Sequence, residues 1–376
     1  MNKEQLDQID RIVSELFKPD YLARVRGKLI YRADEREVDP EAISEVTQRL
    51  LLLGFASQIT QKNGDILLRV YPYSSELAPL RWRINLLLFV ATIFTTMAAG
   101  AILQGKDIFS DFSLITAGWQ YSLAVMIILT SHEMGHFLAG RYHKVNVTLP
   151  YYIPIFFPQF NFGTMGAFIK IKSPIPNRRA LLDIGIAGPL AGLFFSLFFL
   201  TWGYARLPNY EGIIAYVERI HPWNAGNSGV NLVLGKSLIF SFFNDLIAGG
   251  RLPMNEVYHF PFIFAGWIGL LVTAINLMPI GQLDGGHILY SLLKGRARQM
   301  GVLAFVGLLT LNFYLIYQYL SFIWVLWILL VFFLIGFRHP PTLEDEEGLT
   351  PRRRLLGWLS MIIFLLSFIP LPISIQ

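Results

Sequence analysis

The 376-residue chain contains no cysteine. This excludes a disulfide-stapled secreted domain, a thiolate metal site and a cysteine nucleophile. Charge is also scarce: 15% of the residues are Asp, Glu, Lys or Arg, whereas a soluble domain carries about 25%. The first residues, Met1 to Gln8, include no apolar run, so we expect neither a cleavable signal peptide nor an Arg-rich transit peptide.

The few charges are unevenly distributed. Residues 1–83 carry 13 basic and 13 acidic side chains, so the whole net charge of +5 falls on the sparsely charged remainder. This contrast predicts a small soluble head, residues 1–80, followed by a membrane-embedded body, residues 81–376. The basic residues lie between apolar runs and form no single patch. The high pI, about 9.3, therefore does not indicate a nucleic-acid partner, and we expect none.

The head has the pattern of a small α+β unit. Apolar residues recur at helical spacing from Leu6 to Leu16, and a second helix is expected from Pro40 to Leu53. Strands are expected at 28–32 and 65–70, the second after the turn signal Asn63-Gly64. No residues in the head have catalytic spacing. A binding or regulatory role and a plain folded appendage are equally open.

The body contains apolar stretches long enough to cross a hydrocarbon core of about 30 Å. The 37 residues of Gly301–Phe337 exceed one span and suffice for two short ones. The pattern predicts a multi-pass α-helical membrane protein with about seven spans, six to eight being possible. The other expected spans are 84–104, 117–140, 181–203, 260–280 and 355–372, which gives a core at 84–290 and C-terminal spans within 301–372.

Loop charges predict the orientation. With the head in the cytoplasm, 15 Lys and Arg fall on the inner side and five on the outer side. Because basic loops stay on the cytoplasmic side, we expect a cytoplasmic N-terminus.

Three segments do not fit simple spans. Residues 146–172 hold Pro150, Pro154 and Pro158 and then Asn161-Phe-Gly-Thr-Met-Gly166, so one helix is impossible and a re-entrant hairpin lining a cavity is expected. Residues 204–258 are expected to form an insert on the outer side of the membrane, and Leu232 to Ile247 are expected to lie at the membrane–water interface. Residues 338–353, with Glu344–Glu347 and Arg352–Arg354, predict a solvated loop.

The second expected span contains His132-Glu133-Met-Gly-His136. Two His at i and i+4 on one helical face can share a metal ion, and the adjacent Glu can act as general base. Ionisable side chains at membrane depth are costly, so three within five residues indicate function. The alternative is that these polar residues only hold helices together.

Zinc in a hydrolytic site takes three protein ligands. Asp284, in Asn276-Leu-Met-Pro279-Ile-Gly-Gln-Leu-Asp284-Gly-Gly-His287, is the best third candidate, because Pro279 and Gly285-Gly286 are expected to break the helix there. His287 is the rival third ligand, with a supporting or interface role as the alternative. Asp183 is expected to face polar headgroups, with a supporting role as a minority interpretation. The remaining histidines are expected at ordinary surface or interfacial loop positions: His143, His221, His259 and His339.

These motifs resemble the site-2 protease family of zinc intramembrane metalloproteases. The resemblance rests on His132–His136, on Gly188-Pro-Leu-Ala-Gly192 and on Asn276 through Gly285, and covers roughly residues 84–290. The Asn161–Gly166 stretch and the closing Leu283-Asp-Gly-Gly286 resemble the branch that includes plastid and cyanobacterial members of the ethylene-dependent gravitropism-deficient type. The Ile280-Gly-Gln282 spacing departs from the Pro-rich pattern of other branches.

The resemblance implies a zinc-dependent intramembrane endopeptidase that acts in regulated intramembrane proteolysis, with transmembrane protein substrates in a lipid bilayer. His132, His136 and Asp284 would bind one Zn²⁺ per chain, and Glu133 would activate water. Asn276 would hold substrate or the oxyanion, and the segment from Gly163 to Gly166 would pair with an extended substrate strand. A bacterial plasma membrane is the expected location, with a thylakoid-type membrane as the alternative.

Three rival classes have weaker support. A transporter would suit discontinuous helices, but we find no internal repeat of the kind that many transporters show. Gly226-Asn-Ser228-Gly229 suggests a serine intramembrane protease, yet it lies in the polar insert, where a turn is expected. A diaspartyl protease would need a partner for Asp284 in a neighbouring span, and none is present.

Overall fold

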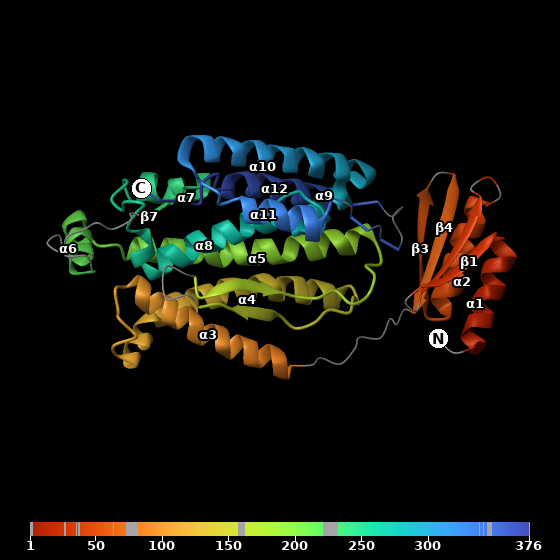
Figure 1. Cartoon of the computed structure of the whole chain (residues 1–376), viewed down its shortest axis with the longest axis horizontal. Helices are drawn as coiled ribbons and strands as arrows, with labels where there is room; N and C mark the ends of the chain where they lie inside the picture. The colour runs from red at the N-terminus through yellow and green to blue at the C-terminus, as the bar shows by residue number, and fades with distance from the viewer. Residues whose placement is uncertain are drawn as a thin grey trace.

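The structure, a computed structural model, describes residues 3–25, 28–34, 36, 38–62, 64–72, 82–156, 162–220, 232–337, 339–340, 342–343 and 348–375. Figure 1 shows a small unit with a β-sheet, formed by the N-terminal residues, and a long helical body. Several residues named above lie outside the described ones: Asn63, Pro158, Asn161, His221, Gly226–Gly229 and Glu344–Glu347.

The head is an antiparallel sheet covered by two helices, as the α+β pattern predicts. Its apolar core is self-contained: Ile9, Val13, Tyr31, Val46 and Leu68 are all fully buried. The strand order is β1-β2-β4-β3. Strands β1 and β3 were not predicted, because the polar sequence of β3 carries little β signal. The elements are α1 (Lys3–Leu16), β1 (Tyr21–Val25), β2 (Lys28–Asp34), α2 (Pro40–Leu52), β3 (Phe55–Lys62) and β4 (Asp65–Pro72).

A buried polar contact joins the sheet of the head to its first helix. The Tyr31 hydroxyl on β2 donates a hydrogen bond to the Asp10 carboxylate on α1. Burial and the neighbouring carboxylate raise the pKa of the Tyr31 phenol. The phenol therefore stays protonated and keeps donating throughout the physiological pH range.

The body is built from long apolar helices. Four helical stretches of the described chain are long and apolar enough to cross a membrane: Arg83–Leu103, Phe112–Tyr142, Arg178–Ala205 and Asp284–Tyr319. Helix α8 and the stretch Val325–Ile335 are apolar but shorter. The helices are α3 (Arg83–Leu103), a 3₁₀ segment (Phe112–Gly118) leading into α4 (Trp119–Tyr142), α5 (Arg178–Ala205), α8 (Pro261–Asn276), α9 (Asp284–Leu293), α10 (Ala297–Tyr319), α11 (Val325–Leu330) and α12 (Pro351–Ser367).

The centre of the body is the packing of α4 and α8 along α5. Tyr121 of α4 stacks on Phe264 of α8 with ring centroids 5.7 Å apart, and Trp267 of α8 is fully buried. Gly266 of α8 admits Leu200 of α5, since a Cβ at Gly266 would lie 2.5 Å from the Leu200 side chain. Small residues thus bring these helices into close contact, as in other membrane bundles.

The expected span at 260–280 is shorter than predicted. Helix α8 ends at Asn276, residues 277–283 form turns, and α9 begins at Asp284. The prediction that Gly285 and Gly286 break the helix is wrong, because both lie in the first turn of α9. A Cβ at Gly285 would lie 2.0 Å from the Leu277 carbonyl oxygen, so this glycine lets α9 pack directly on the preceding loop.

The stretch 301–337 contains two helical segments. Helix α10 ends at Tyr319, Leu320 takes a left-handed conformation with φ 49°, and α11 follows from Val325. A π-helical turn, Val331–Ile335, then ends at Gly336. The stretch is therefore interrupted and does not form one continuous helix.

Residues 146–172 include a β-hairpin. Strand β5 (Tyr151–Pro154) pairs antiparallel with β6 (Thr164–Phe168), and a bridge between Val147 and Ile171 extends the pairing. The hairpin contacts α3 and α4, and the Tyr152 hydroxyl lies 2.8 Å from the Thr130 hydroxyl on α4. Of the described prolines, Pro154 lies in β5 and Pro150 directly precedes it, outside any helix, so that neither needs to donate a helical hydrogen bond.

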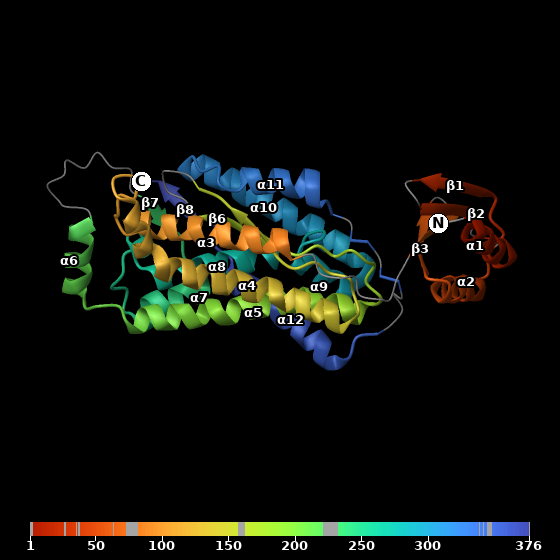
Figure 2. The same cartoon turned by 90° about the horizontal axis from the view of Figure 1, so that it is seen from below.

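The segment between α5 and α8 forms a cap at the end of the body that also holds the C-terminal strand. It contains α6 (Tyr210–Ile220), β7 (Leu232–Leu234), α7 (Leu238–Ser241), a π-helical turn (Phe242–Ile247) and a 3₁₀ turn (Val257–His259). Strand β8 (Ile373–Ile375) pairs antiparallel with β7. Figure 2 shows β7 and β8 at the end of the body where α6 lies.

One histidine of this cap differs from the prediction. His259 was expected at an ordinary loop position, but it is 2% exposed. Its Nδ1 lies 2.5 Å from the Leu103 carbonyl oxygen at the end of α3. The sequence pattern does not indicate the burial of His259, because its hydrogen-bond partner is a main-chain oxygen 156 residues away.

Candidate metal centre

Helix α4 presents the first half of the centre. Its regular geometry places His132 and His136 one turn apart on the same face, with their Nε2 atoms 3.2 Å apart. Both imidazoles and the adjacent Glu133 are buried, with exposed fractions of 3%, 6% and 6%. Three ionisable groups are therefore removed from solvent within five residues of a membrane-length helix.

The turn between α8 and α9 provides the second half. Asp284, the first residue of α9, places Oδ2 at 3.1 Å from His136 Nε2 and 3.4 Å from His132 Nε2. Asn276, the last residue of α8, places Nδ2 at 3.2 Å from His132 Nε2. The structure therefore brings together residues almost 150 positions apart.

The three donor atoms fit a zinc ion. Zinc binds His nitrogen at about 2.0–2.1 Å and carboxylate oxygen at about 2.0–2.2 Å in tetrahedral geometry, which separates neighbouring ligand atoms by about 3.3–3.6 Å. The observed separations of 3.1, 3.2 and 3.4 Å are close to this range. Among the described residues, His132, His136 and Asp284 form the group of ligand side chains that could hold a metal ion.

Helix α5 supports the two imidazoles through small residues. A Cβ at Gly188 would lie 2.1 Å from His136 Nε2, and a Cβ at Gly192 would lie 3.0 Å from His132 Nδ1. On the facing side, a Cβ at Gly135 would lie 2.4 Å from the Ala187 carbonyl oxygen. The Gly188-Pro-Leu-Ala-Gly192 motif is thus the surface against which the histidines pack.

A main-chain hydrogen bond orients one of the histidines. Nδ1 of His136 lies 2.7 Å from the Ile184 carbonyl oxygen on α5. Because a carbonyl can only accept, Nδ1 carries the proton, and the Nε2 lone pair points toward Asp284 and His132. Such a partner is usual for a metal-ligating histidine and fixes its tautomer.

The β-hairpin segment holds Glu133. The backbone of Ile169, which directly follows β6, lies beside the Glu133 carboxylate. Glu133 is also close enough to interact electrostatically with His136 and Asp284. The hairpin therefore fixes the carboxylate at the edge of the three-ligand group.

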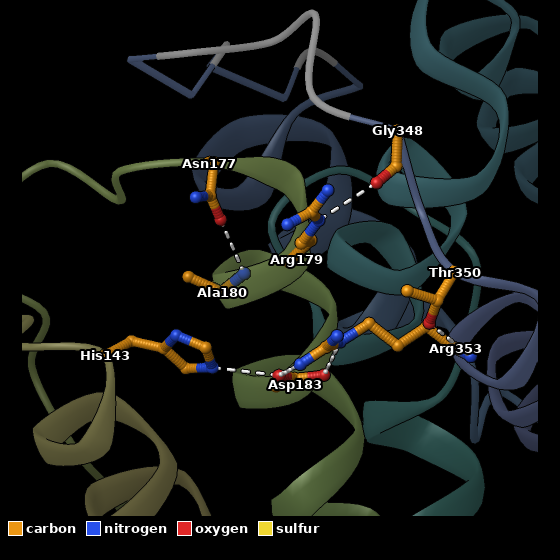
Figure 3. Close-up of polar contacts among 8 residues, drawn as sticks. All are labelled: His143, Asn177, Arg179, Ala180, Asp183, Gly348, Thr350 and Arg353. Carbon is orange, nitrogen blue, oxygen red and sulfur yellow. Dashed lines mark hydrogen bonds and ion pairs between the residues drawn. The ribbon is translucent and has the colours of Figure 1, made fainter.

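A polar clamp beside the centre joins three helices (Figure 3). Asp183 of α5 accepts from Arg353 of α12 through both carboxylate oxygens, at 2.9 and 2.7 Å. His143, which follows α4, lies 2.8 Å from the same carboxylate. The expectation that Asp183 faces headgroups is therefore replaced by a specific role: it links α4, α5 and α12 one residue before Ile184, the partner of His136.

Helix caps and backbone contacts complete the clamp. Asn177 caps α5 by accepting from the Ala180 N–H, and Thr350 caps α12 by accepting from the Arg353 N–H. Arg179 donates to the Gly348 carbonyl just ahead of α12. Helix α12 also contacts α9, where a Cβ at Gly357 would lie 3.0 Å from the Leu292 side chain. Helix α12 thus contacts α5, against which the two histidines pack, and α9, which begins with Asp284.

His287 lies outside the three-ligand group. Its Nδ1 is 2.5 Å from His339 Nε2, and the His339 ring stacks on Tyr290 with centroids 4.4 Å apart. His287 therefore pairs with a second imidazole, and the two side chains link α9 to the segment before α12.

The two predicted substrate glycines lie on the hairpin, away from the ligand atoms. Gly163 has φ +75° and packs on α3, where a Cβ would meet Thr96 Cα at 2.5 Å. Gly166 has φ +102° with nothing within 4 Å of an added Cβ. Both conformations favour glycine. Sequence reasoning missed the main-chain groups of Ile169 and Ile184, which carry no side-chain signal, and Arg353, which lies far along the chain.

Buried ligands on an uninterrupted apolar helix define an α-helical membrane protein with a metallopeptidase-type metal centre. A family model for peptidase family M50 matches residues 120–314, more than half of the chain. The chain belongs to this family, the membrane-embedded site-2 proteases, as the motifs predicted.

Curated relatives support the predicted branch. The chain is 29% identical over 314 residues to the probable zinc metalloprotease EGY1, chloroplastic, of Oryza sativa subsp. japonica, covering 77% of this chain and 50% of the relative. It is 28% identical over 268 residues to the probable zinc metalloprotease EGY2, chloroplastic, of Arabidopsis thaliana, covering 71% of this chain and 44% of the relative. The chain spans about half the length of these relatives. No solved structure matches it significantly.

Proposed function

We propose that the protein is a zinc-dependent intramembrane endopeptidase that hydrolyses a peptide bond in or near a transmembrane segment of its substrates. One observation carries the proposal: two imidazole nitrogens and a carboxylate oxygen converge within 3.4 Å of one another. The two histidines lie on a helix that is long and apolar enough to cross a membrane, and the aspartate begins a second such helical stretch. The zinc metalloprotease names of the relatives support the same conclusion.

The residues of the centre have three different roles: metal ligand, general base and oxyanion donor. His132, His136 and Asp284 would hold one Zn²⁺ per chain, which when bound polarises the scissile carbonyl and makes water acidic enough to lose its proton near neutral pH. Glu133 takes that proton and returns it to the leaving amine. The Asn276 amide, beside His132, donates to the oxyanion that develops on the carbonyl.

The β-hairpin supports a role in substrate binding. A helical substrate hides its peptide bonds, so the chain must be extended before attack. The segment from Gly163 to Gly166 includes the first three residues of β6, and an extended peptide could add to this strand through main-chain hydrogen bonds. We therefore propose transmembrane protein substrates, cleaved in regulated intramembrane proteolysis.

We further propose seven spans with a cytoplasmic N-terminus in a bacterial plasma membrane. His132 lies about nine residues, or ~14 Å, from Arg141 along α4, so the centre would be reached from the inner side. Arg353 at the start of α12 contacts Asp183 near the start of α5. At the other end, Trp324 before α11 donates to the Pro370 carbonyl after α12. These contacts support α11 and α12 each crossing the body.

The absence of cysteine permits a clean topology measurement. Single cysteines at exposed positions, Ser110→Cys, Gln318→Cys and Gly348→Cys, would be probed with a membrane-impermeant maleimide. We expect labelling of the first two from outside and of the third only after permeabilisation. External labelling of Gly348→Cys would mean that residues 301–337 cross only once.

We also propose the division into a head, residues 1–80, and a membrane metalloprotease domain, residues 81–376. The core of the head supports it, since among the residues that the structure describes the cluster around Ile9, Tyr31 and Leu68 draws only on residues before 73. Expression of residues 1–72 alone should give a folded protein with cooperative thermal unfolding. Non-cooperative unfolding would contradict the division.

The proposed activity is tested with purified full-length protein in detergent. We expect about one zinc per chain by elemental analysis and cleavage of a single-span model protein. The Glu133→Gln variant should retain its zinc and lose cleavage, because it keeps the ligands but lacks the base. A metal-free protein, or undiminished cleavage by this variant, would overturn the proposal.

A further inference from the structure

A cleft lies between the hairpin, α8 and α11. Its volume is about 360 Å³, within the range of about 300–1,000 Å³ usual for ligand sites. Its walls include Leu129, one helical turn before Glu133, and Ile275, the residue before Asn276. The cleft is therefore lined by a residue one helical turn from the proposed base and by the residue next to the proposed oxyanion donor.

One wall of this cleft is a strand with an available edge. Thr164, Met165 and Gly166 of β6 line it. Strand β6 pairs with β5 on one side, and the two-stranded sheet contains no further strand among the described residues. An unpaired edge offers main-chain donors and acceptors to an extended peptide.

The opposite wall carries two tryptophans that differ in hydrogen bonding. Trp324 donates from Nε1 to the Pro370 carbonyl oxygen at 2.7 Å. Trp327 also lines the cleft, but its Nε1 is buried and has no hydrogen-bond partner among the described residues. A buried donor without a partner destabilises a fold, so each such case calls for a specific explanation.

We propose that this cleft binds the substrate beside the scissile bond: the Trp327 indole N–H donates to a main-chain carbonyl of the substrate strand, and the cleft accepts a bulky apolar side chain next to the bond that is cleaved. This inference rests on the proposed function. A peptide is the occupant that satisfies the cleft, because it brings both a carbonyl for the indole and a main chain for the edge of β6. A lipid acyl chain would fill the apolar walls but leave the indole unpaired.

The two tryptophans give opposite expectations for stability. Trp327→Phe removes a donor that has no partner in the free protein, so the thermal midpoint should be unchanged or higher. Trp324→Phe leaves the Pro370 carbonyl without its donor, so the midpoint should fall. Zinc content should remain one per chain in Trp327→Phe, because Trp327 does not belong to the three-ligand group.

Cleavage tests the proposed contact directly. The probe is a set of fluorescence-quenched peptides with one apolar segment, in which the residue next to the cleaved bond is Ala, Leu or Phe. Trp327→Phe should lower kcat/KM about three- to tenfold, the worth of one hydrogen bond, mainly through KM. Replacement of Trp327 by benzothienylalanine, which keeps the ring shape without the N–H, should do the same.

A cleft-filling variant tests the side-chain preference. Val272→Trp places a larger side chain of α8 in the cleft. The ratio of kcat/KM for the Phe peptide to kcat/KM for the Ala peptide should fall at least fivefold. If the wild-type protein cleaves no peptide of the set, the proposed function itself fails. If it cleaves them but Trp327→Phe has the same kcat/KM, or if Val272→Trp leaves the preference unchanged, the assignment of this cleft is wrong.

Discussion

The two halves of the metal centre are built in different ways. His132 and His136 lie on one uninterrupted helix, which fixes their relative position through local geometry alone. Asn276 and Asp284 lie on either side of a break, where α8 has ended and α9 begins. The first half is therefore defined by spacing along the sequence, whereas the second exists only because loop 277–283 turns the chain at the correct depth.

Glycines support both halves but meet different partners. Gly188 of α5 makes room for a ligand side chain, since an added Cβ would meet the His136 imidazole. Gly285 of α9 makes room for main chain, since an added Cβ would meet the Leu277 carbonyl. A larger side chain at Gly188 would thus displace a metal ligand directly. A larger side chain at Gly285 would displace α9, and Asp284 would move with it.

The largest effect is expected from Gly188→Ala. The added methyl group would lie 2.1 Å from His136 Nε2, which forces the ligand atom itself to move. Zinc affinity should fall more than about 100-fold, beyond the usual effect of disturbing a supporting residue. Zinc titration by competition with a chelating dye measures this. Gly307→Ala, at a helical glycine with nothing within 4 Å, is the control, and equal zinc affinity in both variants would contradict the packing described.

The second expected effect separates the candidates for the third ligand. Asp284→Asn replaces a charged ligand oxygen with a neutral one, and zinc affinity should fall about 10–100-fold, as for other changes around metal ligands. His287→Ala should change affinity less than about twofold, because His287 Nδ1 contacts His339. The same titration compares them. A larger loss in His287→Ala would assign the third ligand to His287.

A smaller effect is expected from Gly285→Ala. The new methyl group would lie 2.0 Å from the Leu277 oxygen, so α9 must shift and carry Asp284 with it. Zinc affinity should fall about tenfold, less than for Gly188→Ala because both imidazoles stay in place. Gly295→Ala, where nothing lies within 4 Å, serves as the control. A loss as large as that of Gly188→Ala would mean that the two halves are equally rigid.

The smallest effect concerns the clamp that links both halves through α12. Arg353→Ala removes two hydrogen bonds to the Asp183 carboxylate, and the free energy of unfolding in mixed detergent should fall by about 2 kcal/mol. Zinc affinity should fall only a few-fold. Asp183→Asn should make the same Arg353→Ala change less costly, because neighbouring mutations that share an interaction are not additive. Strict additivity would show that the contact contributes no coupling.

The sequence predicted those features that depend on local periodicity or composition. The apolar runs located the helices of the body, and the His132–His136 spacing located the first half of the centre. The Asp284 prediction depended on the scarcity of polar residues at membrane depth. Strands β1 and β3 were missed because their pattern is only weakly alternating.

Other features had no accessible signal in the sequence. Main-chain groups such as the Ile184 carbonyl and the Ile169 backbone leave no trace in residue type. The Arg353 contact spans 170 positions, and a run of arginines next to acidic residues is ordinarily solvated. His259 and Asp183 were misplaced for the same reason: burial of a polar group becomes predictable only when the partner that satisfies it is known.

The pairing of β8 with β7 has a practical consequence for handling the protein. Residues 373–375 form part of a sheet with the cap, and Gly235 donates to the Pro372 carbonyl at 2.8 Å. Trimming those residues would uncover the hydrophobic side chains behind them and favour aggregation during purification. Affinity tags are therefore best fused to the N-terminus, ahead of the head, where the added residues do not disturb the pairing of β7 with β8.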